Sequence, residues 1–235
     1  MTERLYQRDS YLKEFKAEVT RIVPEEGAVV LDQTAFYPGG GGQPSDSGYL
    51  DHVKVTGCRS VAGEILHLLD GPAPELGAQL DAAIDWDRRH KLMRTHTAMH
   101  VLCGVVFRDY GALVTGGDME PLRGRMDFEF ARLEGSLVSE IEFAVNREIR
   151  AARDVRVQIL PREEAFRIPD LIRTKINLLP ATITEVRIVE IVGLDLQADG
   201  GTHVRNTEEV GSIRVVDYRS KGANNKRLYL EVEDA

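Results

Sequence analysis

The chain has 235 residues, of which 43% are hydrophobic and 29% charged, and its formal net charge is −8. This composition is ordinary for a folded protein with a core, and the negative charge argues against a protein that coats nucleic acid non-specifically. No apolar run approaches the roughly 20 residues of a membrane helix, and the first residues lack the apolar stretch of a signal peptide. Because Cys58 and Cys103 are the only cysteines, we expect a cytoplasmic protein without disulfides and without a membrane segment.

Residues 1–86 are predicted to form a first domain of short β-strands. Apolar and β-branched residues occur in short runs over 20–37 and 49–69, broken by Gly and Pro. The segment 38–48 contains four successive glycines and is predicted to be a loop between two such runs. This rhythm fits a small barrel or sandwich that ends at a hinge over 84–87.

Residues 87–235 are predicted to form a second domain in which helices and strands do not alternate strictly. Apolar residues at helical spacing predict a helix over 87–110, capped by Asp87, and another over about 133–152. Strands are predicted at 155–159, 185–191, 211–216 and 227–232. The predicted fold class is therefore α+β with an antiparallel sheet.

Three histidines and one aspartate are candidate metal ligands. His96 and His100 are four residues apart on the predicted helix, so their imidazoles project from one face, about 40° apart. Asp199 and His203 flank two glycines, which favours a turn that presents both side chains. Together they make a reasonable four-coordinate zinc site, and without Asp199 a water would take the fourth position. On spacing alone, surface histidines and a simple turn fit equally well.

Cys103 lies on the same predicted helix as His96 but about 10 Å further along its axis. One ion cannot bind His96, His100 and Cys103 together. We interpret Cys103 as a small buried apolar residue.

The residues around these ligands resemble a known family. Arg94-Thr-His-Thr-Ala-Met-His100 and Gly200-Gly-Thr-His-Val-Arg-Asn-Thr-Glu-Glu-Val-Gly211 look like the editing domain of alanyl-tRNA synthetase. In length the chain resembles the free-standing AlaX family of trans-editing proteins. The segment 31–46 is similar to the glycine-rich motif of the longer AlaX members, and similar segments follow at 125–128, 160–165 and 220–227. The resemblance covers nearly the whole chain.

This resemblance implies a small N-terminal β-barrel joined to an α+β editing domain. It also implies zinc-assisted hydrolysis of the ester that joins serine to tRNA(Ala), with glycine as a second candidate amino acid and no need for ATP. The metal would either generate a hydroxide nucleophile from water or only orient the substrate. The family's usual zinc turn begins with Cys where this chain has Asp199, which leaves that carboxylate as ligand, base or bystander. The alternative function is a tRNA-binding module that lost catalysis with this replacement.

Such an enzyme is needed because binding energy alone discriminates poorly between small amino acids. One methyl group contributes only about 1–3 kcal/mol of binding free energy, so a pocket shaped for alanine cannot reject glycine strongly. Serine is barely larger than alanine. Thr115 lies where the resemblance places a threonine, and it is the candidate for bonding the serine hydroxyl; a turn hydroxyl is the alternative. The candidates for contacting tRNA, through loop amides, polar groups or phosphate-binding cations, are Thr34, Gly41, Gly42, Gln43, Arg88, Arg89, Lys221, Lys226 and Arg227. For the basic residues, an ordinary solvated surface is the alternative.

Overall fold

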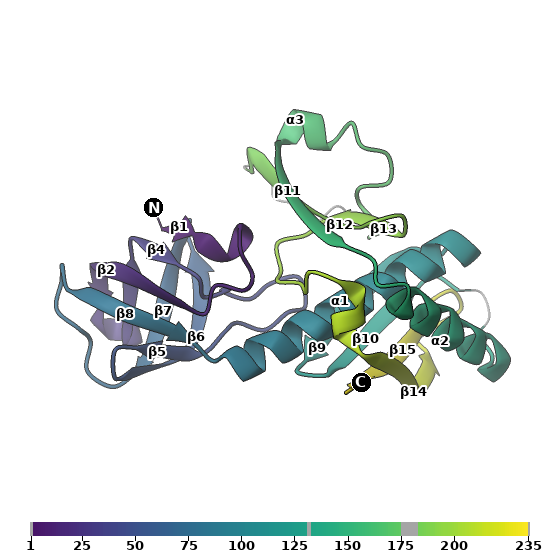
Figure 1. Ribbon diagram of the computed structural model, residues 1–235, viewed down its shortest axis with the longest axis horizontal. Coiled ribbons are helices and arrows are strands. Elements are labelled where there is room, and N and C mark those ends of the chain that lie inside the picture. The colour runs from purple at the N-terminus through teal and green to yellow at the C-terminus, as the bar shows by residue number, and fades with distance from the viewer. Residues whose placement is uncertain (1, 131–132, 175–182, 235) are drawn as a thin grey trace. The chain divides into compact units, whose positions relative to one another are not determined.

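The computed structural model describes residues 2–130, 133–174 and 183–234, and the chain divides into two compact units, Met1–Lys91 and Leu92–Ala235. Both units are rich in strands, and the main sheets are antiparallel (Figure 1). The mixed fold with antiparallel sheets is thereby confirmed. No helix of the described residues is long and apolar enough to cross a membrane.

The first unit is a closed antiparallel sheet. Its strands are β1 (Glu3–Arg4), β2 (Glu14–Val23), β3 (Ala28–Leu31), β4 (Gln33–Thr34), β5 (Gly48–Leu50), β6 (Val53–Val61), β7 (Glu64–Asp70) and β8 (Gln79–Ile84), with 3-10 turns at Leu5–Gln7 and Pro24–Glu26. Six of them pair in the order β2-β3-β7-β6-β5-β8, and β8 pairs again with β2. Alternate strand residues point inward, and the enclosed core includes Val19, Val29, Leu31, Leu50 and Ile65.

A two-residue turn forms the tip of the glycine loop between β4 and β5. The N–H of Gly40 donates to the carbonyl of Gln43 at 3.0 Å, and the N–H of Gln43 donates back at 2.9 Å. Between them, Gly41 and Gly42 have φ angles of 58° and 88°. Consecutive positive φ angles are what a tight hairpin turn requires, and glycine adopts them without a steric penalty.

The second unit contains two sheets and the helices around them. Its helices are α2 (Gly135–Arg150), α3 (Arg162–Ala165) and the part of α1 (Trp86–Tyr110) from Leu92 onward, and it also has a 3-10 turn at Thr207–Val210. One sheet has the order β14-β15-β10-β9, formed by β14 (Ser212–Ser220), β15 (Lys226–Glu233), β10 (Arg123–Phe128) and β9 (Val114–Glu120). The other has the order β11-β12-β13, formed by β11 (Val155–Pro161), β12 (Glu185–Ile191) and β13 (Asp195–Ala198). The predicted strands correspond to β11, β12, β14 and β15, whereas β9, β10 and β13 were not predicted.

Helix α1 begins at Trp86, and the predicted cap is wrong by two residues. Asp85 accepts the backbone N–H of Arg88 through its carboxylate at 3.2 Å, and its carbonyl accepts the N–H of Arg89. Asp85 is therefore the N-cap. Asp87 lies in the first turn instead, where it pairs with Lys91 at 2.7 Å.

Within the second unit, α1 contacts both sheets. Every residue from 92 to 106 is buried. Met99 packs closely on the larger sheet, since a Cβ at Gly124 of β10 would lie 2.9 Å from the Met99 sulfur. Gly104, further along the helix, faces the start of β13 in the smaller sheet. A helix buried around its whole circumference needs a bonding partner for each polar side chain that it carries.

Candidate metal centre

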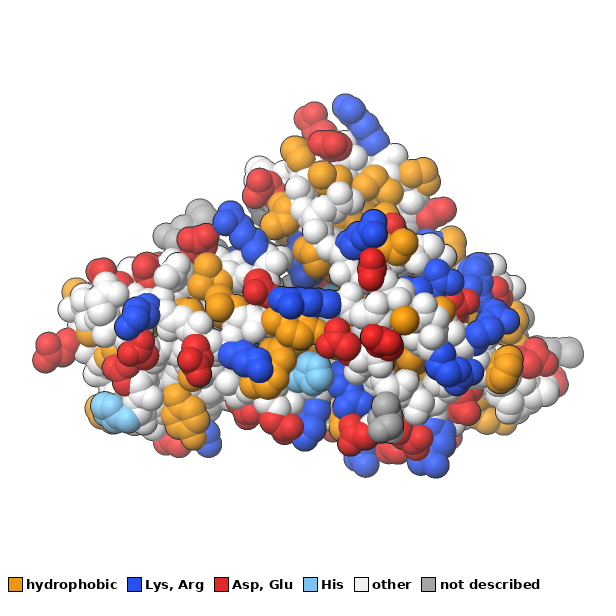
Figure 2. All heavy atoms as spheres, viewed as in Figure 1, with side chains coloured by type: hydrophobic (Ala, Val, Ile, Leu, Met, Phe, Trp, Pro, Cys, Tyr) orange, Lys and Arg blue, Asp and Glu red, His pale blue; other side chains and the backbone are white. Residues whose placement is uncertain are grey.

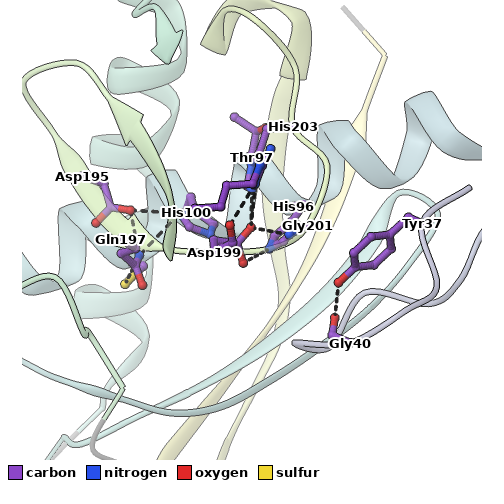
Figure 3. Close-up of polar contacts among 12 residues, drawn as sticks. Tyr37, Gly40, His96, Thr97, His100, Asp195, Gln197, Asp199, Gly201 and His203 are labelled. Atoms are coloured by element: carbon purple, nitrogen blue, oxygen red, sulfur yellow. Dashed lines mark hydrogen bonds and ion pairs between the residues drawn. The ribbon is translucent and has the colours of Figure 1, made fainter. Parts of the chain in front are cut away.

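Four side chains from two segments of the second unit meet at one point. His96 and His100 come from α1, and Asp199 and His203 come from the turn that follows β13 (Figure 3). One potential ligand atom from each lies within 4.8 Å of all the others, so the group could hold a metal ion. The three rings are close, with centroids 4.2 Å apart for His96–His203 and 5.1 Å apart for His96–His100. The three histidine residues are 3–7% exposed, so water reaches them poorly.

The glycine turn folds Asp199 back onto the histidines. Its Oδ1 accepts the N–H of Gly201 at 2.8 Å, which is the hydrogen bond of an Asx-turn. The same oxygen lies 2.9 Å from Nε2 of His203, and Oδ2 lies 3.6 Å from Nε2 of His96. The carboxylate thus faces two imidazole nitrogens at once.

Hydrogen bonds on the far side of two rings orient them. Nδ1 of His100 lies 3.0 Å from Oδ2 of Asp195. Nδ1 of His203 lies 3.2 Å from the hydroxyl of Thr97, which also accepts the N–H of Val204. In both rings Nδ1 is engaged from outside, so Nε2 is left for the point where the four side chains meet.

Burial and the neighbouring charges shift the pKa values of all four side chains. Burial lowers the pKa of His96 well below its usual value and that of His203 to about 4. Burial acts the same way on His100, but the hydrogen bond to Asp195 and the nearby Asp199 outweigh it and raise that pKa. Burial alone would raise the pKa of Asp199, yet His96 and His203 hold it well below its usual value. Metal binding requires an ionised carboxylate and neutral imidazoles, which these shifts favour at Asp199, His96 and His203, whereas His100 would give up its proton to a metal.

The outer residues Asp195, Gln197 and Thr97 were missed by sequence reasoning. Asp195, Gln197 and Asp199 recur every second residue, the spacing that places strand side chains on one face. That alternation was the available signal. Cys103 lies beside this outer layer, 3.3 Å from Nε2 of Gln197, and is not one of the four grouped residues.

Two of the tRNA-contact candidates in the first unit are internal. Thr34 is fully buried, and its hydroxyl lies 2.8 Å from Nε2 of His67 and accepts the N–H of Phe36. Arg89 is also fully buried: its Nε lies 2.9 Å from Asp46, and Nη2 donates to the carbonyl of Ala35 at 2.6 Å. Neither side chain lies on a surface that phosphates could reach. Their expected contact role is corrected to a structural one.

The other tRNA-contact candidates in this unit belong to the glycine loop or contact it. Gly41 is exposed at the tip of the turn, Gly42 is half-buried, and Gln43 is buried. Arg88 is half-buried, and its Nη1 donates to the carbonyl of Ser45 at 2.8 Å, at the end of the same loop.

In the second unit, Thr115 and Lys221 are exposed, whereas two basic candidates are engaged within the fold. Thr115 lies on strand β9, not in a turn, and its hydroxyl donates to Oδ1 of Asn225 at 3.0 Å. Lys226 is buried and donates from Nζ to the carbonyl of Gly222 at 2.7 Å, so it ties the β14–β15 turn and is not a surface cation.

Arg227 makes two hydrogen bonds to the carboxylate of Asp127, at 2.6 and 2.7 Å. Because this bidentate pair neutralises the charge of Arg227, we expect Arg227 to attract phosphate less strongly than an exposed lysine would. On the face shown in Figure 2, acidic and basic side chains are interspersed. Any binding of nucleic acid on that face would therefore depend on local contacts.

Comparison with known proteins identifies the family. Residues 186–229 match the family described as threonyl and alanyl tRNA synthetase second additional domain, and residues 8–88 match tRNA synthetases class II (A). Over 99% of its length the chain is 41% identical to the whole alanyl-tRNA editing protein AlaX-M of Saccharolobus solfataricus. It is 37% identical over its full length to the whole AlaX-M of Methanosarcina barkeri. Over 91% of its length it is 39% identical to a quarter (25%) of the alanine–tRNA ligase of Pyrobaculum aerophilum. These matches confirm the resemblance, and the chain belongs to the AlaX-M family of alanyl-tRNA editing proteins.

Proposed function

We propose that this protein hydrolyses the ester bond of mischarged tRNA(Ala), removing serine in preference to alanine. The observation that carries the proposal is the group formed by the buried His96, His100 and His203 with the half-buried Asp199. The relatives that match the whole chain are named for alanyl-tRNA editing, which supports the same reaction. We further propose that residues 87–235 form the editing domain and that residues 1–86 form a small β-barrel carrying the glycine loop.

The donor set fits zinc. Ligand atoms about 2.1 Å from a tetrahedral zinc ion lie about 3.4 Å from each other, so a group already within 4.8 Å needs only a small contraction. Three imidazoles and one carboxylate are donors that zinc accepts. A zinc ion held there supplies Lewis-acid chemistry to the ester carbonyl.

For Asp199 the proposed role is that of the fourth ligand. An effective general base has a pKa near the working pH. The pKa of Asp199 is instead held well below its usual range by the neighbouring histidines, which makes the carboxylate a weak base and a good anionic ligand. Its Oδ1 keeps the hydrogen bond to Gly201, so the turn fixes the position of the carboxylate.

Selectivity would come from groups outside the ligand set. We propose that Thr115 offers its hydroxyl to the side chain of serine; with alanine this hydroxyl would gain no partner from the substrate. The proposed contacts to the tRNA remain the candidates not engaged as internal structural residues: Gly41, Gly42, Gln43, Arg88, Lys221 and Arg227.

The test uses serylated and alanylated tRNA(Ala), incubated with the metal-loaded protein in the presence or absence of a chelator. Rapid loss of the serine ester, slow loss of the alanine ester and suppression by the chelator are expected. His96→Ala should abolish the reaction, and replacement of the exposed His52 by Ala should not change it. If the serine ester survives, the proposal that the protein is a hydrolase is wrong, and the alternative function, a tRNA-binding module, takes its place. If both esters disappear at one rate, the proofreading role fails. Glycyl-tRNA(Ala) in the same assay tests glycine.

A further inference from the structure

A second carboxylate, Asp195, lies directly behind the metal-ligand group without belonging to it. Asp195 is buried at the start of β13, with Oδ2 3.0 Å from Nδ1 of His100 (Figure 3). Nε2 of Gln197 donates to the same oxygen at 2.7 Å. When a carboxylate accepts the Nδ1–H of an imidazole, the lone pair that remains for a metal is on Nε2.

Gly104 gives Asp195 the room to reach His100. It lies one helical turn after His100, on the same face of α1. A Cβ at Gly104 would lie 3.0 Å from Cβ of Asp195 and 2.9 Å from Cγ of Leu194. The contact with Leu194 is closer than real Cβ atoms come, and the contact with Asp195 is tighter than most. We therefore expect a side chain at this position to push the start of β13 away from the helix and lengthen the hydrogen bond to His100.

The carboxylate is held in place from its other side as well. Asp195 pairs with Ile191 in the β12–β13 ladder, which fixes its backbone. Nε of Arg173 lies 3.8 Å from Oδ1 of Asp195, as an ion-pair partner of the carboxylate. With its backbone in the ladder and Oδ2 bonded to both Gln197 and His100, the carboxylate is well placed to orient the ring that it contacts.

We infer that Asp195 is a positioning residue: its hydrogen bond to Nδ1 fixes the tautomer and orientation of His100, so that Nε2 faces the metal, and Gly104 provides the space for this contact. The inference rests on the proposed function, because it concerns the same site. It assigns no contact between Asp195 and the substrate.

The test measures metal binding rather than catalysis. Cobalt(II) serves as the probe, with affinity measured by competition with a chromophoric chelator and ligand geometry read from the absorption spectrum of the loaded protein. Asp195→Leu should weaken binding by about 10–100-fold and change the spectrum. Asp195→Asn keeps an oxygen acceptor for Nδ1–H and should recover most of the affinity. Gly104→Ala should weaken binding in the same direction without altering any ligand or its partner.

Two control variants separate positioning from general destabilisation. Glu148→Gln removes another buried carboxylate of this unit, one that pairs with Arg108 and Arg153 rather than with a histidine. Gly135→Ala adds a methyl group to another helical glycine, where the nearest atom is the Tyr218 hydroxyl at 3.4 Å. Both should keep the cobalt affinity within about twofold of the wild type, well short of the 10–100-fold loss expected at Asp195.

The possible failures are distinguishable. Wild-type affinity and an unchanged cobalt spectrum in Asp195→Leu and Gly104→Ala would overturn the positioning role and leave the proposed function intact. An equal loss of affinity in Glu148→Gln would also overturn it, because the effect would then follow stability. A wild-type protein that binds no cobalt would overturn the metal site and the inference together.

Discussion

Acidification should destabilise the closed sheet of the first unit through one buried histidine. His67 on β7 is fully buried, with Nε2 2.8 Å from the hydroxyl of Thr34 and Nδ1 3.3 Å from the carbonyl of Val29. Burial lowers the pKa of His67 from 6.5 to about 4. Between these two values the unfolded chain binds a proton that the folded chain does not. Stability contributed by the neutral ring is therefore complete above about pH 6.5 and is lost as the pH falls toward 4.

The size of the effect follows from these two values. At about pH 5, protonation of His67 in the unfolded chain raises the unfolding equilibrium constant by a factor of roughly 30, which corresponds to about 2 kcal/mol. The full pKa shift from 6.5 to about 4 corresponds to about 3 kcal/mol of unfolding free energy. His67→Gln removes the titrating group and should remove this part of the pH dependence. The assay is urea unfolding of the wild type and the variant at about pH 7.5 and about pH 5.

When the variant is compared with the wild type, the pH dependence contributed by the histidines that both proteins share cancels. The free energy of unfolding of the wild type should fall by about 2 kcal/mol more than that of His67→Gln between the two pH values. His52→Gln, at an exposed position, should behave like the wild type. Equal pH dependence in the wild type and His67→Gln would refute the argument.

Three further outcomes are expected. Asp199→Ala should lower zinc affinity at least about tenfold, by equilibrium dialysis, whereas Asp199→Cys should retain it; unchanged zinc binding in the alanine variant would remove Asp199 from the ligand set. Arg89→Met leaves the buried charge of Asp46 unpaired and should cost about 3–5 kcal/mol in urea unfolding, with part recovered when Asp46→Asn is added; a loss below about 1 kcal/mol would contradict this. Thr115→Val should leave the melting temperature unchanged, because the side chain is exposed, but narrow the ratio of serine-ester to alanine-ester hydrolysis; an unchanged ratio would exclude Thr115 from selection.

The grouped residues could be predicted because each depends on local geometry. Four residues make about one helical turn, so His96 and His100 share a face wherever the helix lies. The glycines between Asp199 and His203 likewise permit a turn whatever surrounds it. Bringing the two segments together is a tertiary event, and only the resemblance pointed to it.

Contacts between distant parts of the sequence could not be predicted. Arg89 stands in a basic run that is typical of a surface, yet its partner Asp46 lies 43 residues earlier. The His100–Asp195 hydrogen bond spans 95 residues. In strand β9, Gly116 and Gly117 give a weak strand signal, but pairing with β10 overrides that local preference.

The four side chains that form the candidate centre contain no sulfur. Cys58 and Cys103 are both buried outside that group, and burial raises the pKa of each thiol, which keeps it protonated and slow to react. Peroxide attacks thiolates and converts them stepwise into oxyacids that no longer hold a metal, whereas imidazole and carboxylate ligands do not enter this series. Oxidative stress that strips metal from thiolate sites should therefore leave these four side chains chemically intact.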